Sequence, residues 1–115
     1  MQTLTLYGNR LSGTLPTELG QLSSLQYLGL GANSLSGTVP TEIGRLATSL
    51  TDGLYLWRNR LSGTLPSQLA QLRPTICTLS TPPGAATSGG NCFACPLPSA
   101  LSSACAAGVA CSAAC

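Results

Sequence analysis

The sequence predicts a right-handed α/β solenoid, with short parallel β-strands on a concave side and short helices or 3-10 turns on a convex side. Three observations predict it. A leucine-rich segment recurs along the first part of the chain, each copy carries asparagine, glycine and proline at the same places, and all six cysteines follow Leu72. One copy alone cannot bury its leucines, so the copies are expected to stack on one another.

The repeat is clearest in Leu4–Leu22, which reads LTLYGNRLSGTLPTELGQL. It returns as LGLGANSLSGTVPTEIGRL at Leu28–Leu46 and as LYLWRNRLSGTLPSQLAQL at Leu54–Leu72. Agreement at nearly every leucine, asparagine, glycine and proline excludes chance. Stacked copies of this segment would cover each other's apolar faces, so the repeat predicts one continuous core.

We therefore divide the chain into three leucine-rich repeats over residues 1–74, a degenerate fourth repeat over 75–101 and a Cys/Ala-rich C-terminal cap or tail over 102–115. In the fourth repeat, Asn91 aligns with Asn9 and Phe93 aligns with Leu11. Cys77 takes the place of Leu4. Residues 81–90, rich in proline, glycine and small side chains, form an inserted loop.

The recurring residue types have physical roles in such a coil. Leu-x-Leu gives a short strand with both leucines on one face. A buried asparagine after each strand can bond the bare backbone groups of the bend and of the next coil, so we expect an asparagine ladder. Its members are Asn9, Asn33, Asn59 and Asn91. Gly13, Gly37 and Gly63 are expected in a tight bend. The proline that follows opens a convex helix, which Gly20 and Gly44 are expected to end.

Composition excludes most catalytic chemistry. Charged residues make up 7% of the chain, every base is arginine, and there is no histidine. The composition therefore excludes Schiff-base catalysis by lysine, general acid–base catalysis by histidine and metal sites that use histidine. A net charge of +2 is too small to favour binding of nucleic acid. Glu18 and Glu42 could suggest a glycosidase pair. We interpret them as solvated charges on the convex side, and expect no enzyme and no cofactor.

The pattern L-x-x-L-x-L-x-x-N-x-L-S-G-x-(L/V)-P-x-x-(L/I)-G-x-L resembles the plant-type leucine-rich repeat of receptor-like kinase ectodomains and polygalacturonase-inhibiting proteins. The resemblance covers residues 1–74 strongly and 75–101 loosely. It implies a leucine-rich-repeat horseshoe that binds peptides, carbohydrates or proteins.

Concave strand positions remain for function once the repeat residues are set aside. The candidate ligand-binding residues are Tyr7, Tyr27, Tyr55, Trp57 and Arg58. Tyr7, Gly31 and Trp57 share one template position, so strands ~4.8 Å apart would hold the two rings ~9–10 Å apart over a glycine floor. Such a slot would suit a sugar ring or an extended peptide. The alternative interpretation is that the rings only cover strand backbone.

The cysteines predict a disulfide-stapled cap and an oxidising compartment. They are Cys77, Cys92, Cys95, Cys105, Cys111 and Cys115, and sequence does not choose among their pairings. A zinc site built on the Cys-x-x-Cys segment is the alternative. An extracellular or cell-surface location follows from disulfides, although residues 1–20 hold no signal peptide, so we expect an internal start or a fragment.

The predicted function is a non-catalytic recognition module that binds a protein, peptide or carbohydrate ligand on its concave face. The module would belong to a secreted or cell-surface protein, with no membrane span in this chain and no nucleic-acid partner. The alternative is a purely structural solenoid whose partner is the rest of a longer repeat protein. The layer of Leu4 and Leu6 is expected to face water, which predicts self-association through the N-terminal face or cover by further repeats.

Overall fold

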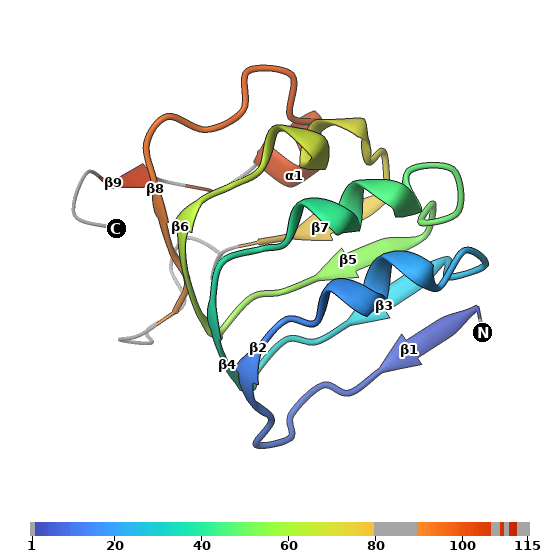
Figure 1. Cartoon of the computed structure of the whole chain (residues 1–115), viewed down its shortest axis with the longest axis horizontal. Helices are drawn as coiled ribbons and strands as arrows, with labels where there is room; N and C mark the ends of the chain where they lie inside the picture. Colours follow the sequence, from blue (N-terminus) through green and yellow to red (C-terminus); the bar gives the residue numbers. More distant parts are fainter. Residues whose placement is uncertain (1, 80–89, 107–108, 110, 113–115) are drawn as a thin grey trace.

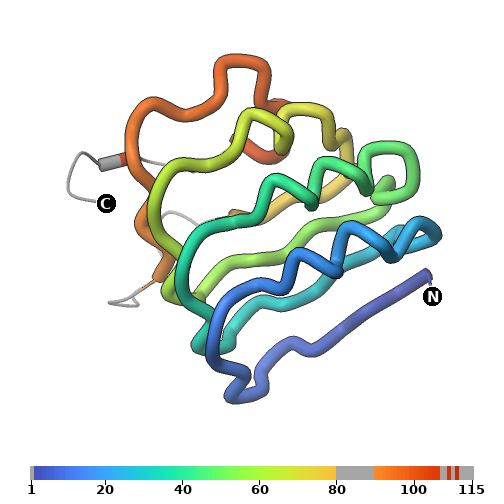
Figure 2. Tube along the Cα trace, viewed as in Figure 1, coloured from blue at the N-terminus to red at the C-terminus, as the bar shows by residue number. Residues whose placement is uncertain are grey.

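The computed structural model describes residues 2–79, 90–106, 109 and 111–112. Its chain winds in successive coils, each with strands on one side and a short helix on the other (Figure 1). Figure 2 shows the coils lying side by side in chain order. The fold is the predicted right-handed solenoid of parallel strands, and this prediction is confirmed.

One parallel sheet lines the concave side. Its register joins the leucines of successive coils, because Leu4 pairs with Leu28, Leu28 with Leu54, and Leu54 with Cys77. Leu28 and Leu54 are fully buried, so this face of the sheet forms one wall of the core. The strands, in sheet order, are β1 (Thr3–Thr5), β3 (Tyr27–Gly29), β5 (Gly53–Tyr55) and β7 (Ile76–Thr78).

A second parallel sheet lies where the sequence predicted only a tight bend. Gly13, Gly37 and Gly63 lie within its strands, with φ of +87°, +78° and +76°. Each left-handed glycine bends its strand without ending the pairing to the next coil. The bend is therefore present as predicted, and the parallel pairing of these segments is an additional finding. The strands are β2 (Ser12–Thr14), β4 (Ser34–Gly37), β6 (Arg60–Thr64), β8 (Cys92–Ala94) and β9 (Cys111–Ser112).

The second sheet advances by the same step at every coil. Gly13 pairs with Leu35, Gly37 with Leu61 and Gly63 with Phe93. Phe93 therefore takes the same pairing position as the leucines of the earlier coils, and it is buried as they are. Strand β8 therefore continues the second sheet next to β6, with the same shift in register as the strands before it.

The convex side carries one 3-10 helix per repeat. Gly20 and Gly44 do not end these helices, as the sequence suggested, but lie inside them. A Cβ on Gly20 would lie 2.5 Å from the carbonyl oxygen of Glu42, and one on Gly44 would lie 2.8 Å from Cβ of Gln68. Glycine is required at both positions because the next helix approaches its backbone too closely to leave room for a Cβ. The helices are η1 (Thr17–Gln21), η2 (Thr41–Leu46) and η3 (Ser67–Gln71).

The core ends in a cap at the C-terminal side. Helix α1 (Ser103–Ala106) is tied to β7 by the disulfide Cys77–Cys105, and both cysteines are buried with the leucines. The disulfide Cys95–Cys111 links β9 to the segment after β8. At the other end of the core, Leu6 is 37% exposed.

The asparagines bond neighbouring coils together. Asn59 is the most enclosed, at 3% exposed. Its Oδ1 accepts the backbone N–H of Leu35 at 3.1 Å, and its Nδ2 donates to the carbonyls of Leu30 at 2.9 Å and Leu56 at 3.0 Å. Side-chain bonds of the same kind link adjacent coils at Asn33 and Asn91.

Candidate functional site

On β3 and β5, the two central strands of the concave sheet, the outward positions alternate between tyrosine and glycine. In the first outward row, Tyr27 pairs with Gly53, and in the next, Gly29 pairs with Tyr55. Each of these two rings therefore has no side chain beside it on one neighbouring strand, whereas on the other neighbouring strand Tyr27 pairs with Thr3 and Tyr55 pairs with Thr78. This alternation decides how the rings lie.

Each glycine is covered by a neighbouring ring. A Cβ on Gly31 would lie 2.7 Å from Nε1 of Trp57, and a Cβ on Gly53 would lie 2.7 Å from Cε2 of Tyr55. Gly29 is covered in the same way by Tyr27, at 2.9 Å. The rings therefore rest on the backbone of the sheet instead of standing upright from it.

The rings meet in two tilted pairs. The ring centroids of Tyr7 and Trp57 are 5.7 Å apart and those of Tyr27 and Tyr55 are 5.2 Å apart, each pair at 38° between planes. The predicted open slot of ~9–10 Å between Tyr7 and Trp57 is wrong. Because Gly31 has no side chain, the two rings lean across it and make contact.

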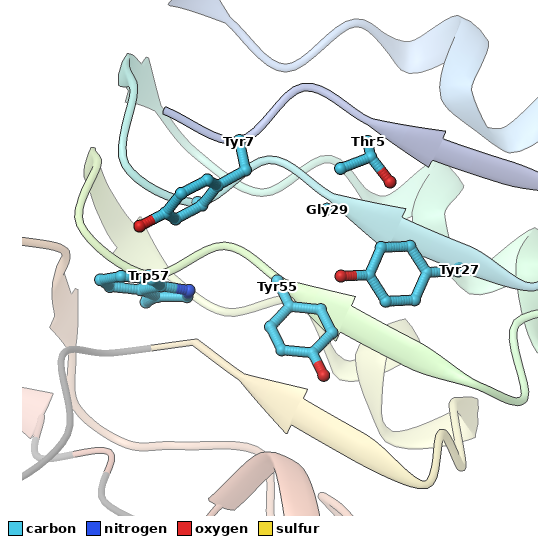
Figure 3. A pocket seen from close by; sticks show the side chains of 7 residues that line it. Thr5, Tyr7, Tyr27, Gly29, Tyr55 and Trp57 are labelled. Atoms are coloured by element: carbon cyan, nitrogen blue, oxygen red, sulfur yellow. The ribbon is translucent and has the colours of Figure 1, made fainter. Parts of the chain in front are cut away.

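A shallow cleft of about 300 Å³ lies among these rings (Figure 3). None of its lining residues is charged, and none of the polar atoms of its side chains bonds to another described group. Figure 3 shows Nε1 of Trp57 directed toward Tyr55 and the hydroxyl of Tyr27 directed into the cleft. The lining is made up of Thr5, Tyr7, Tyr27, Gly29, Gly31, Tyr55 and Trp57.

Four of the five candidate ligand-binding residues line the cleft, and Arg58 does not. Its guanidinium lies 5.8 Å from the ring centre of Trp57, within the range of a cation–π contact. Arg58 has φ of +53° and an exposed side chain, so it flanks the cleft. The selection of candidates by aromatic character left out Thr5, although its position on an outward strand site was a usable signal.

The described cysteines all form disulfide bonds. Cys77 pairs with Cys105 and Cys95 pairs with Cys111, while Cys92 is also disulfide-bonded. The zinc alternative, which needs free thiolates, is therefore wrong for these residues. Within the part of the chain that the structure describes, no three histidine, cysteine or acidic residues gather as metal ligands do. The predicted candidate Cys115 and the inserted loop, apart from Gly90, lie outside the described residues.

The family is shown by sequence. A model of the family Leucine Rich Repeat matches residues 1–22, 24–46 and 53–72, more than half of the chain. The chain belongs to the leucine-rich-repeat family, and its repeats are of the plant type. A comparison with curated protein sequences gives no match.

Solved structures of plant receptors are similar to the chain. The plant peptide hormone receptor RGFR1 in complex with RGF2 is 35% identical, with a TM-score of 0.69 over 82% of this chain and 14% of the receptor. The BIR2 ectodomain from Arabidopsis thaliana is 33% identical, with a TM-score of 0.69 over 84% and 46%. PEPR1–AtPEP1 is also 33% identical, with a TM-score of 0.69 over 84% and 12%. The chain thus spans less than half the length of each.

Two further observations concern the compartment. Disulfides form and persist in oxidising environments, so the bonds in the cap are consistent with an extracellular location. In the described ranges no helix has the length and apolar character needed to cross a membrane.

Proposed function

We propose that the chain is a non-catalytic recognition module of a secreted or cell-surface protein, and that it captures its ligand in the aromatic cleft of the concave face. The observation that carries this proposal is the cleft itself, where four aromatic rings gather on the concave face, Tyr7 exposed and the other three half-buried. Exposed Trp and Tyr that are already held in place are common anchors of binding surfaces.

The similar structures support a binding role. RGFR1 is a peptide hormone receptor in complex with RGF2, and PEPR1 is in complex with AtPEP1. The absence of histidine in the chain, and the position of Glu18 and Glu42 on the convex helices, speak against catalysis in the cleft.

Binding to a printed array of peptides and glycans tests the proposal. The intact chain should bind at least one class of ligand, and Tyr55→Ala with Trp57→Ala should abolish capture while circular dichroism keeps its native form. Ile76→Ala is the matched control, because Ile76 is a 48% exposed apolar residue of the same sheet that does not line the cleft. An intact protein that binds nothing would favour the alternative, a purely structural solenoid.

We propose in addition that the apolar face of the first coil is covered by a second copy of the chain. Leu6 and Leu11 are each 37% exposed, and β1 pairs only with β3 within the described sheets. An unpaired strand edge beside exposed leucines favours association. Sedimentation of the purified chain tests self-association. A stable monomer at tens of micromolar with protected amides in residues 3–8 would overturn it.

A further inference from the structure

We propose that the ligand of the aromatic cleft is a neutral oligosaccharide, bound through stacking of its sugar rings on Trp57 and Tyr55. This inference rests on the proposed function, because it assumes that the cleft is a binding site. It adds the chemical class of the ligand. The evidence is the charge, the polarity and the rigidity of the lining.

The charge of the cleft fits a neutral ligand. All its lining residues are Thr, Tyr, Trp or Gly, so no side chain in it can pair with an ammonium, a carboxylate or a sulfate. Burying a charge without a partner is costly. A peptide with charged side chains or an acidic saccharide would find no charged partner among the lining residues, and the guanidinium of Arg58 lies 5.8 Å from the ring centre of Trp57 outside that lining. Uncharged sugars carry no such penalty.

The polarity of the cleft matches the two kinds of surface on a pyranose ring. Such a ring has apolar C–H faces and a rim of hydroxyls. The cleft presents aromatic faces for the first, and the hydroxyls of Tyr7, Tyr27, Tyr55 and Thr5 with the indole N–H of Trp57 for the second. None of these polar atoms has a partner among the described residues, so each is available to a sugar hydroxyl.

The rings are held in place before any ligand arrives. Trp57 rests on Gly31 and against Tyr7, and Tyr55 rests on Gly53 and against Tyr27. Anchors that are already ordered lose little conformational entropy on binding, which favours stacking of weak ligands such as sugars. The volume of about 300 Å³ is at the lower end of ligand pockets, so the cleft holds a short segment of a longer saccharide.

Intrinsic fluorescence provides the test, because Trp57 is the single tryptophan of the chain. The protein is titrated with neutral hexasaccharides of glucose, mannose and xylose, with hexagalacturonate as the acidic counterpart. We expect a saturable change in Trp57 emission with at least one neutral hexasaccharide below about 1 mM, and none with hexagalacturonate.

Three variants show whether a change in affinity comes from lost ring stacking, from a lost hydrogen bond or from misfolding. Tyr55→Leu should weaken hexasaccharide affinity by about tenfold, because it removes the flat ring, whereas Tyr55→Phe should stay within about threefold. Ile76→Ala, outside the cleft on the same sheet, should bind as the unmodified chain does.

The outcomes distinguish this inference from the function on which it rests. If array peptides bind in a Tyr55-dependent way while every neutral saccharide fails, or if hexagalacturonate binds best, the saccharide inference is wrong and the recognition function stands. If neither saccharides nor peptides bind, both fail.

Discussion

Tyr7 in the first coil and Trp57 in the third are in ring contact across Gly31, with centroids 5.7 Å apart. Contacts in a solenoid normally join neighbouring coils only. This contact passes over the second coil, because Gly31 leaves its place on the concave face empty. The aromatic surface therefore ties the first coil to the third, and the site and the stability of the solenoid depend on the same glycine.

Gly31→Ala should separate the two rings. The new methyl would lie 2.7 Å from Nε1 of Trp57, so either the ring or the strand has to move. We expect a loss of about 1–3 kcal/mol in the free energy of unfolding, and a changed emission of Trp57. Urea denaturation and fluorescence measure the two effects.

A double-mutant cycle identifies the cause of that loss. In a Trp57→Ala background the methyl at Gly31 has no ring to meet, so most of the penalty should disappear. A penalty of the same size in both backgrounds would mean that the strand backbone, and not the ring, rejects the methyl.

The asparagine ladder should weaken unequally when it is cut. Asn59→Ala removes bonds to two backbone groups of the adjacent coil and to the carbonyl of Leu56 in its own coil, in a site that is 3% exposed, so about 2–3 kcal/mol should be lost. Asn9 is exposed and bonds only to the carbonyls of Leu6 and Tyr7 in its own coil, so Asn9→Ala should cost less than about 1 kcal/mol. The urea midpoints of the two variants, at an unchanged m-value, measure their losses in the free energy of unfolding. Equal losses for Asn59→Ala and Asn9→Ala would contradict this account.

The repeat could be predicted from the sequence because its three copies carry leucine at nearly the same positions. Within the strands, Leu28 and Leu54 lie on the buried face and Tyr27 and Tyr55 on the outward face, as strand alternation assigns them. The second sheet escaped prediction because β2, β4 and β6 each contain a glycine, a residue depleted in strands, and because its pairing comes from the stacking of coils. The contact between Tyr7 and Trp57 escaped because ring direction depends on the empty place above Gly31, and template spacing gives only strand distances.

Ala32→Gly should stabilise the chain slightly. Ala32 has φ of +55°, at the same template position as Gly8 with +72°. The left-handed conformation destabilises the folded chain by about 1–2 kcal/mol when the residue is not glycine. Glycine removes this strain but destabilises the folded chain by about 0.5–1 kcal/mol, because it gives the unfolded chain more conformational entropy. We therefore expect a net gain of up to about 1 kcal/mol in the free energy of unfolding.

Ala47→Gly is the matched control for that substitution. Ala47 has φ of −58° and ψ of −32°, which alanine adopts freely, so glycine there should destabilise by about 0.5–1 kcal/mol. Opposite signs at the two sites, measured by thermal and urea unfolding, are the expected result. A loss at both sites would show that the left-handed conformation at Ala32 carries little cost.

The disulfides Cys77–Cys105 and Cys95–Cys111 should contribute differently to stability. Their loops differ little, with sequence separations of 28 and 16, so chain entropy alone separates them by only about 0.5 kcal/mol. Cys77 and Cys105 are buried among the leucines, whereas Cys95 is exposed. Removing the first pair therefore also opens a gap in the core.

We expect Cys77→Ala with Cys105→Ala to cost about 4 kcal/mol, and Cys95→Ala with Cys111→Ala to cost about 2 kcal/mol. Urea denaturation of the two double variants under oxidising conditions measures the difference. Losses that agree within about 0.5 kcal/mol would mean that both bonds act through the unfolded chain alone. In that case burial of Cys77 and Cys105 adds nothing, and packing of the cap against the leucine core is not what closes this end of the solenoid.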